Sequence, residues 1–200
     1  MVEVQKHGFI FETWIKKILG VKRLAEYYTQ KWDIPGEMPV SVKCMGLKNA
    51  LELGSTVRFW EINKPFTLVI GRWKQVGVRK KIVSIDEIDI TPEILKKLRG
   101  RVSLKEIRIF DKKIKTFPPG KAGQKKGIKF AREWKNKNKN RFGLLTITHK
   151  IDSKEQRRIQ CNLNLKNYVE IFGKISMKAK FRGVDFKQKI NHASRKFNEK

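Results

Sequence analysis

The stretch WDIPGEMPVSVK, residues 32–43, carries the strongest local signal in this chain of 200 residues. Its Pro-Gly pair is a turn signal, and the residues on either side favour short β-strands, so the stretch predicts a tight hairpin. A turn within it places Asp33 across from Val40 or Ser41. Since successive side chains of a strand point to opposite faces, Ser41 and Lys43 are expected to share one face. The hairpin would then bring an acid and a lysine to one end of a small sheet.

Asp33 and Lys43 are the residues of this hairpin that can perform chemistry. A carboxylate beside an ammonium group can hold a divalent metal and orient a water for attack on phosphorus. Hard oxygen ligands suit Mg²⁺, with Mn²⁺ as a possible substitute, and the metal completes its shell with water and substrate phosphate. Glu12, on a predicted helix before the hairpin, could add a second carboxylate. The plainer alternatives are a surface ion pair between Asp33 and Lys43, and a helical pair between Glu12 and Lys16.

This order of a Glu-bearing helix, an Asp, a turn and a strand ending in Lys resembles the PD-(D/E)XK nuclease superfamily. It is most similar to type II restriction endonucleases with a Ser-Val-Lys variant of the motif, and its layout also resembles archaeal Holliday-junction resolvases. The firm part of the resemblance lies within residues 8–73, in Phe11-Glu12, Trp32-Asp33 and Pro39-Val40-Ser41-Val42-Lys43. The resemblance implies a Mg²⁺-dependent nuclease with a restriction-endonuclease-like core.

The family has an acid at the position where Ser41 stands in this chain. Some members move that acid to a later helix, and Glu52 or Glu61 would take the role here. Glu52 is preferred because it lies nearer in sequence. The resemblance therefore implies catalytic roles for Asp33, Ser41, Lys43, Glu12 and Glu52, with Asp33, Glu52 and Glu12 as metal ligands. A second stretch, residues 150–161, is also similar to sequences of restriction enzymes.

Basic residues dominate the composition, with 47 Lys and Arg against 19 Asp and Glu and a formal net charge of +28. A binder of small acidic ligands would need only a local basic pocket, so charge this widespread favours a polyanion. Residues 1–111 have a net charge of +8 and residues 112–200 one of +20. We therefore expect the second part to grip the phosphate backbone of nucleic acid. The alternatives are a ribosomal-type protein and a solvated lysine-rich face.

Several other classes of protein are disfavoured by what the sequence lacks. No apolar run approaches the roughly 18 residues that a membrane span needs, and the first residues have no signal-peptide layout. Cys44 and Cys161 lie far apart, without a Cys/His cluster that would indicate zinc. We therefore expect a soluble, cytoplasmic protein that has no membrane partner and no small-molecule cofactor.

The remaining periodicity predicts a mixed α/β fold, with a central mixed sheet flanked by helices and a basic C-terminal hairpin and helix part. Helices are expected at 8–29, 55–62, 91–100, 103–115 and 166–172. Strands are expected at 66–73, 78–85, 142–149 and 158–165. Three Gly and two Pro predict a loop at 117–127, followed by a basic helix or frayed loop at 128–140. The predicted domains are a nuclease core at 1–116, that loop, and a basic DNA-binding part at 128–200.

The predicted hairpin loop at 152–157 mixes basic, acidic and amide side chains. Arg pairs with guanine, Gln with adenine, and an acid accepts from cytosine, so this mixture predicts base readout in the major groove. The readers would be Lys154, Gln156, Arg157, Arg158 and Gln160; an ordinary charged tip is the alternative. Phosphate contacts are expected from Lys125, Lys126, Lys129, Arg132, Lys135, Lys137 and Lys139. Trp134, which lies among them, is the aromatic residue expected to stack on a base.

These features together predict a Mg²⁺-dependent, sequence-specific endonuclease of restriction type that cuts double-stranded DNA. A homodimer is expected because two strands require two active sites. A structure-specific nuclease such as a junction resolvase would share the catalytic core and is one alternative. A basic nucleic-acid-binding protein without activity, in which Asp33 and Lys43 are structural, is the other.

Overall fold

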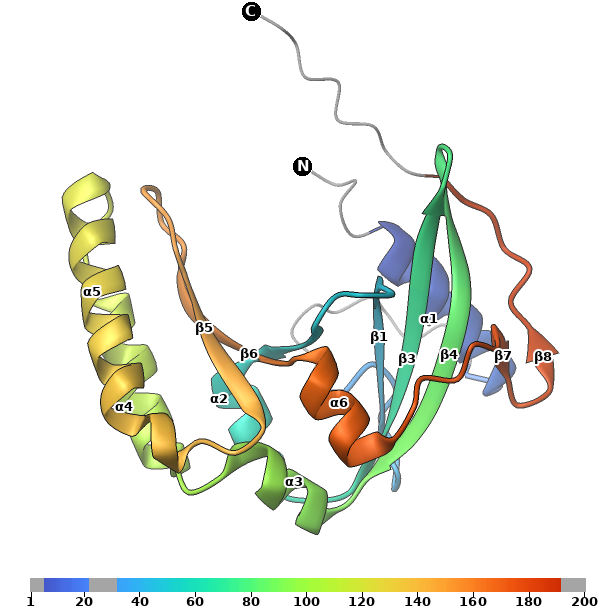
Figure 1. Cartoon of the computed structure of the whole chain (residues 1–200), viewed down its shortest axis with the longest axis horizontal. Helices are drawn as coiled ribbons and strands as arrows, with labels where there is room; N and C mark the ends of the chain where they lie inside the picture. The colour runs from blue at the N-terminus through green and yellow to red at the C-terminus, as the bar shows by residue number, and fades with distance from the viewer. Residues whose placement is uncertain (1–5, 22–31, 192–200) are drawn as a thin grey trace, which may run out of the picture. The chain divides into compact units, whose positions relative to one another are not determined.

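The computed structural model describes residues 6–21 and 32–191, and its elements form two compact units that alternate along the chain (Figure 1). Unit 1 takes the described residues within 1–49, 66–89 and 172–200, and unit 2 takes residues 50–65 and 90–171. The units therefore do not follow the predicted division into 1–116 and 128–200. Each contains a sheet with at least one helix packed on it, and the predicted mixed α/β class is confirmed.

Unit 1 contains a four-stranded mixed sheet with the order β1-β3-β4-β9. Its strands are β1 (Val40–Gly46), β3 (Phe66–Val76), β4 (Arg79–Ile90) and β9 (Ile190–Asn191). β1 runs parallel to β3, whereas β9 runs antiparallel to β4. The strands predicted at 66–73 and 78–85 are confirmed as β3 and β4, which are neighbours in the sheet. Two short strands, β7 (Lys180–Phe181) and β8 (Val184–Asp185), pair separately.

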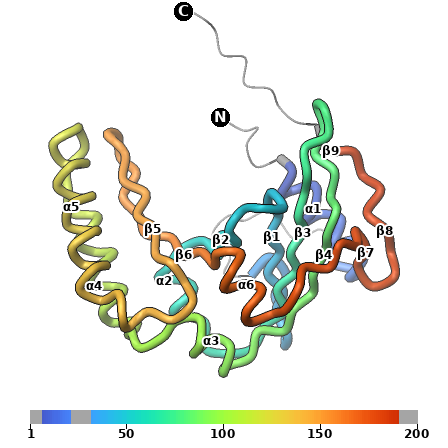
Figure 2. Tube along the Cα trace, in the orientation of Figure 1, coloured from blue at the N-terminus to red at the C-terminus, as the bar shows by residue number. Residues whose placement is uncertain are grey.

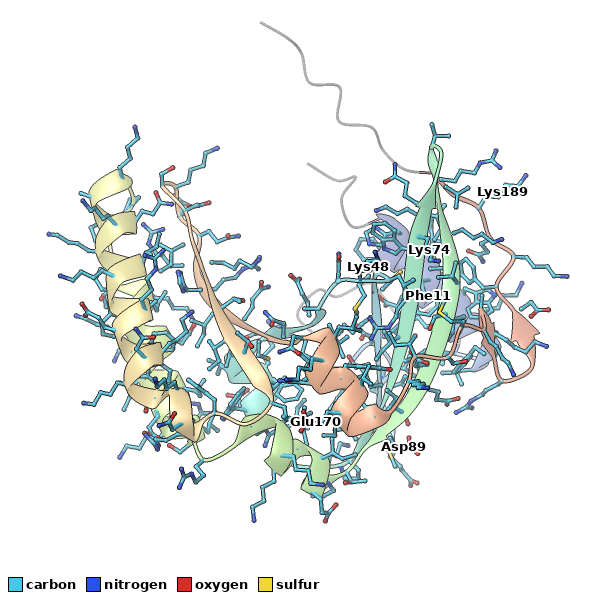
Figure 3. All side chains as sticks on the ribbon, viewed as in Figure 1. Phe11, Lys48, Lys74, Asp89, Glu170 and Lys189 are labelled. Carbon is cyan, nitrogen blue, oxygen red and sulfur yellow. The ribbon has the colours of Figure 1, made fainter. Side chains whose placement is uncertain are left out.

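Helix α1 (Lys6–Ile18) covers one face of this sheet. Its apolar stripe of Phe11, Trp14 and Ile15 is buried against Val42 and Val69. Phe11 can lie directly on β3 because position 71 is Gly, where a Cβ would come within 2.7 Å of the ring (Figure 3). The predicted helix at 8–29 is thus confirmed for its first part, while positions 22–29 lie outside the described residues.

Unit 2 contains an antiparallel three-stranded sheet with the order β2-β6-β5, which can be followed in Figure 2. The strands are β2 (Leu51–Ser55), β5 (Leu145–Ile151) and β6 (Arg157–Leu163). The helices are α2 (Thr56–Trp60), α3 (Pro92–Arg99), α4 (Leu104–Lys115), α5 (Lys121–Asn138) and α6 (Leu165–Phe172), with a 3₁₀ turn η2 (Lys139–Arg141). No helix of the described segments is both long enough and apolar enough to cross a bilayer.

The predicted helix starts of unit 2 are confirmed by their caps. The Ser55 and Thr91 side chains cap α2 and α3, and Gly100 ends α3. Ser103 and Glu106 form a capping box at the start of α4. Glu106 also binds both terminal nitrogens of Arg141, at 2.6 and 2.9 Å. These hydrogen bonds, first from Arg141 and then from Ser103, lower the pKa of Glu106 to about 2.

The capping carboxylate gives unit 2 a predictable acid sensitivity. Because the pKa of Glu106 is lower in the folded chain than its ordinary value of 4.5, its stabilising effect is complete above pH 4.5. That effect is lost as the pH falls from 4.5 toward about 2. Glu106→Gln should therefore lower the urea midpoint at pH 7 and flatten its pH dependence in this window. Glu170→Gln, on exposed α6, is the control, and equal pH profiles for both variants would contradict this account.

The predicted loop at 117–127 was wrong from Lys121 onward, because α5 begins there and continues through most of the basic segment that follows. Gly123, Gly127 and Ala131 lie four residues apart and are all buried on one side of α5. A Cβ at Gly123 would come within 1.9 Å of the Pro118 carbonyl oxygen. The glycines thus act as small residues that let a helix pack closely, whereas the sequence pattern indicated helix breakers.

Candidate functional site

The turn after Asp33 forms as predicted, but its first flank makes a single antiparallel bridge at Ile34 in place of the predicted short strand. Ile34 and Val40 exchange two backbone hydrogen bonds of 3.0 and 2.8 Å, which sets Asp33 opposite Ser41. Asp33 Oδ2 accepts a hydrogen bond from the backbone N–H of Val42 at 2.6 Å and one from Ser41 Oγ at 3.1 Å. Lys43 Nζ lies 3.3 Å from the same oxygen. The acid, hydroxyl and amine are therefore brought together.

Burial of the neighbouring valines positions these groups. Val40 and Val42 pack into the core beneath α1, so the alternation of the strand turns Ser41 and Lys43 to the other face of the sheet. The side chains of Asp33 and Lys43 are each 27% exposed. The pair is thus fixed by the core on one side while solvent or a substrate can still reach it.

The outer edge of β1 supplies oxygen ligands. Val40 uses both its N–H and its C=O toward Ile34 on this edge, and Val42, two residues later, has the same orientation. The Val42 carbonyl therefore faces the edge where its N–H binds Asp33. Asp33 Oδ1 accepts no hydrogen bond from the described residues. A carboxylate oxygen and a carbonyl oxygen, with the Ser41 hydroxyl nearby, fit the hard-oxygen preference of Mg²⁺, which keeps several waters.

Glu12 does not join this group. It lies on α1, which covers the Val42 face of the sheet, and it pairs with Lys16 at 2.6 Å. This is the plain helical ion pair that the sequence offered as an alternative. The expectation that Glu12 is a metal ligand beside Asp33 is therefore not met within unit 1.

The other predicted acids belong to unit 2. Glu52 on β2 lies 4.0 Å from Lys150, and Glu61 binds Arg108 at 2.8 Å. Within residues 6–21 and 32–191, no three His, Cys, Asp or Glu side chains form a group that could hold a metal. Asp33 is thus the carboxylate that unit 1 offers at the candidate site.

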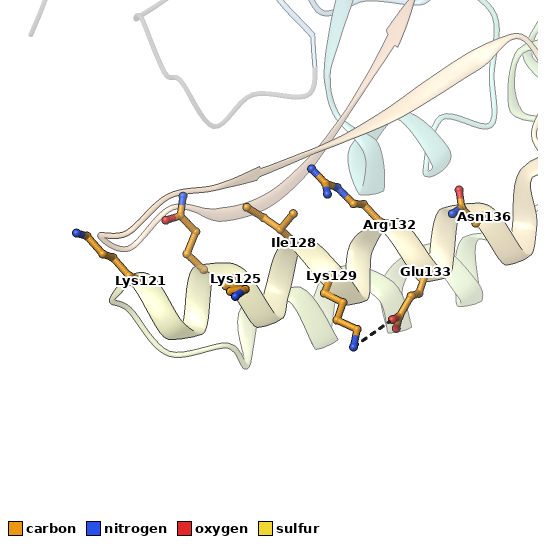
Figure 4. A pocket seen from close by; sticks show the side chains of 8 residues that line it. Lys121, Lys125, Ile128, Lys129, Arg132, Glu133 and Asn136 are labelled. Carbon is orange, nitrogen blue, oxygen red and sulfur yellow. Dashed lines mark ion pairs between the residues drawn. The ribbon is translucent and has the colours of Figure 1, made fainter.

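The predicted phosphate contacts lie on an exposed helix of a basic unit. Unit 2 holds 25 of the 47 basic residues and 9 of the 19 acidic ones. Along α5 runs an open groove of about 510 Å³, and Lys121, Lys125, Lys129 and Arg132 are among the residues that line it (Figure 4). The predicted contacts Lys125, Lys126, Lys129 and Arg132 are all exposed. This surface can bind an extended polyanion.

His149 lies beside basic residues of α5 and was not singled out by the sequence. Its pKa is lowered by burial and then by the charges of Lys135 and Arg132 on α5. The pKa of Lys135 is lowered by burial and by Arg132. Positive groups crowd together here, so a bound anion would relieve their repulsion. The sequence signal that could have identified His149 was its place on a predicted strand that follows a basic helix.

Arg157 does not fit the predicted role of base reader. Its guanidinium donates four hydrogen bonds, to the carbonyl oxygens of Phe117, Pro118, Asp152 and Gln156. Its side chain is only 6% exposed. The guanidinium therefore ties the hairpin to the segment before α5. The other predicted readers Lys154, Gln156 and Arg158 are exposed, and Gln160 is half-buried.

Arg157→Ala should consequently act on stability. Removing a charged donor from four carbonyl oxygens is expected to cost about 1–3 kcal/mol, because hydrogen bonds to charged groups contribute more than neutral ones. Arg158→Ala is the matched control and should cost less than about 0.5 kcal/mol, since its side chain is exposed. Urea unfolding measures both. If both variants lower the free energy of unfolding equally, the structural role of Arg157 is contradicted.

Trp134 is a packing residue of unit 2. Its ring stacks on Phe110 of α4 with centroids 4.0 Å apart and an interplanar angle of 4°. It also contacts Phe142, at 5.8 Å. One face of the Trp134 ring is therefore occupied by Phe110, because the helix turns this side of α5 toward α4.

Comparison of the chain with known protein families, with curated proteins and with solved structures found no significant match. Any assignment of function therefore depends on the residues and their geometry. The most informative geometry is the convergence of Val42 N–H, Ser41 and Lys43 on one oxygen of Asp33.

Proposed function

We propose that this chain is a metal-dependent endonuclease that hydrolyses phosphodiester bonds in double-stranded DNA at specific sequences, as type II restriction enzymes do. The observation that carries the proposal is the Asp33–Ser41–Lys43 group at the open edge of β1. The resemblance to PD-(D/E)XK nucleases involves the same residues. The proposal places the chain in the cytoplasm with its DNA.

The residues of the site have distinct tasks in this reaction. A bound Mg²⁺ would supply Lewis acidity toward a phosphate oxygen and a water. Asp33 Oδ1 and the Val42 carbonyl would hold it, while Oδ2 stays fixed by the Val42 N–H and by Ser41. Lys43, 3.3 Å from Asp33, would hold the attacking water or a phosphate oxygen by hydrogen bonding. Its positive charge would also stabilise the negative charge on the phosphoryl oxygens in the transition state.

DNA as the substrate is supported by charge. The chain has a net charge of +28, and α5 exposes a row of basic side chains. Phosphate contacts of this kind give sequence-independent affinity that falls as salt rises. Cleavage of both strands would use two copies of the chain, and we propose a homodimer on DNA.

A second candidate function is DNA binding without cleavage. This function is favoured because Glu12 pairs with Lys16 and so does not supply a second carboxylate beside Asp33 in unit 1. Asp33 and Lys43 would then be a structural ion pair that closes the hairpin. Such a half-exposed pair contributes about 0–1 kcal/mol.

Incubating the full chain with plasmid DNA and with a synthetic four-way junction, each with Mg²⁺ or Mn²⁺, separates these functions. Discrete plasmid fragments are expected. Cleavage of the junction alone would favour a structure-specific nuclease. Binding to DNA without cleavage by either metal would contradict the proposed nuclease and favour the second candidate.

A further inference from the structure

The β5–β6 hairpin of unit 2 has one polar face. Buried and more exposed residues alternate along both strands, so the residues between the buried ones share this face. The strand register sets Lys150 opposite Arg158, and Thr148 opposite Gln160. Each opposed pair has its Cβ atoms about 5 Å apart, and successive rows lie about 7 Å apart. The face therefore presents charged and amide side chains in ordered rows.

This hairpin continues beyond the sheet as two strands. β2 pairs with β6 only as far as Ser55, which lies opposite Gln160. The row of Lys150 and Arg158 and the tip at 152–156 lie past that point. The major groove of DNA, which is about 12 Å wide, can admit a two-stranded β-ribbon.

The projecting hairpin is held rigidly to its own unit. Arg157 binds the carbonyl oxygens of Phe117 and Pro118, and the Gly120 N–H donates to the Ser153 carbonyl at 2.8 Å. Gln124 of α5 donates to the Ile151 carbonyl at 3.2 Å. The hairpin tip is therefore joined to α5 and to the segment before it by several hydrogen bonds. A recognition element fixed in advance loses less conformational entropy on binding.

Arg157 and Arg158 are neighbours with opposite surroundings. The guanidinium of Arg157 is used within the protein, whereas the Arg158 side chain is exposed and makes no hydrogen bond with the described residues. The Gln160 side chain, which lies on the same face, also makes no hydrogen bond with the described residues. Arg can bind guanine with two hydrogen bonds and Gln can bind adenine with two.

We propose that the polar face of the β5–β6 hairpin reads base edges in the major groove of duplex DNA, with Arg158 and Gln160 determining specificity. This inference rests on the proposed DNA substrate and moves base reading from the hairpin tip to its flat face. The basic row on α5, which packs beside β5, then contacts phosphates. Duplex RNA does not suit this face, because its major groove is deep and too narrow for side chains to read.

The test is selection of bound duplexes from a randomised DNA library, by the full chain with EDTA present to prevent cleavage. The wild-type chain should enrich a defined sequence. Gln160→Ala and Arg158→Ala should each lose about 5- to 150-fold discrimination at one base pair. Lys129→Ala on α5 is the matched comparison, and should weaken binding to all sequences by a similar factor.

Two outcomes would overturn the inference. In the first, Gln160→Ala and Arg158→Ala weaken binding uniformly, as Lys129→Ala does. In the second, the wild-type chain enriches no sequence or prefers duplex RNA. A parallel cleavage assay with Mg²⁺ reports on the proposed nuclease separately, because loss of base preference with retained cleavage refutes only the reading face. Altered preference without any cleavage supports the reading face and refutes only the nuclease.

Discussion

Asp33→Asn should abolish DNA cleavage, by at least about 10²–10⁴-fold, while changing DNA affinity by less than about threefold. The amide can still accept hydrogen bonds from the Val42 N–H and Ser41, so the hairpin should keep its shape. It loses the negative charge that would hold a cation, and Lys43 loses its ionic partner. Single-turnover cleavage and a gel-shift titration measure the two effects separately.

Asp89→Asn is the control for that variant. Asp89 is also a carboxylate of unit 1, and it accepts a hydrogen bond from Thr67 at 2.8 Å. Its replacement should leave cleavage within about twofold, because it lies outside the candidate site. A similar loss of activity in both variants would indicate a general effect of charge or folding. Full activity of Asp33→Asn would remove Asp33 from the site.

Gly100→Ala should destabilise unit 2 by about 2–5 kcal/mol. Gly100 has φ of +70°, where an alanine is strained by about 1–2 kcal/mol. Its Cβ would also lie 2.2 Å from the backbone nitrogen of Gly143. Forcing backbone segments apart adds about 1–3 kcal/mol of overpacking. Urea unfolding should show the loss.

Gly54→Ala separates the two parts of this effect. Gly54 has φ of +85° in the same unit, and its Cβ would meet nothing within 4 Å. It should therefore cost only the conformational strain of about 1–2 kcal/mol. If Gly100→Ala costs no more than Gly54→Ala, the close approach of Gly100 and Gly143 contributes nothing to stability.

Local signals predicted many of the helices and longer strands, although β2 and the start of α5 were missed. The Pro-Gly turn, the Ser and Thr caps and the alternation of β6 each depend on a few adjacent residues. The convergence of Asp33, Ser41 and Lys43 followed from the same local rules. The division into two units did not follow from local rules, because it depends on which distant strands pair. β1 pairs with β3, although β2 and α2 lie between them in the sequence.

The sequence contained signals for two of the wrong predictions. The alternation that puts Ile159 and Cys161 on the buried face also assigns Arg157 to that face, which explains its internal hydrogen bonds. The spacing of Gly123 and Gly127 is that of a closely packed helix face. The role of Glu12 was ambiguous in the sequence, because a glutamate at this position could either pair with Lys16 along the helix or bind a metal.

Cleavage of plasmid DNA by the wild-type chain, Lys43→Ala and Lys48→Ala, with Mg²⁺ and with EDTA, tests the central claim most directly. Lys48 is an exposed lysine of unit 1, close to Lys43 in sequence, so its removal changes the charge equally (Figure 3). The wild-type chain and Lys48→Ala should cut with Mg²⁺ and not with EDTA, and Lys43→Ala should bind without cutting. Equal cleavage by both lysine variants, or no cleavage by the wild-type chain with Mg²⁺ or Mn²⁺, would contradict a nuclease site at Asp33 and Lys43.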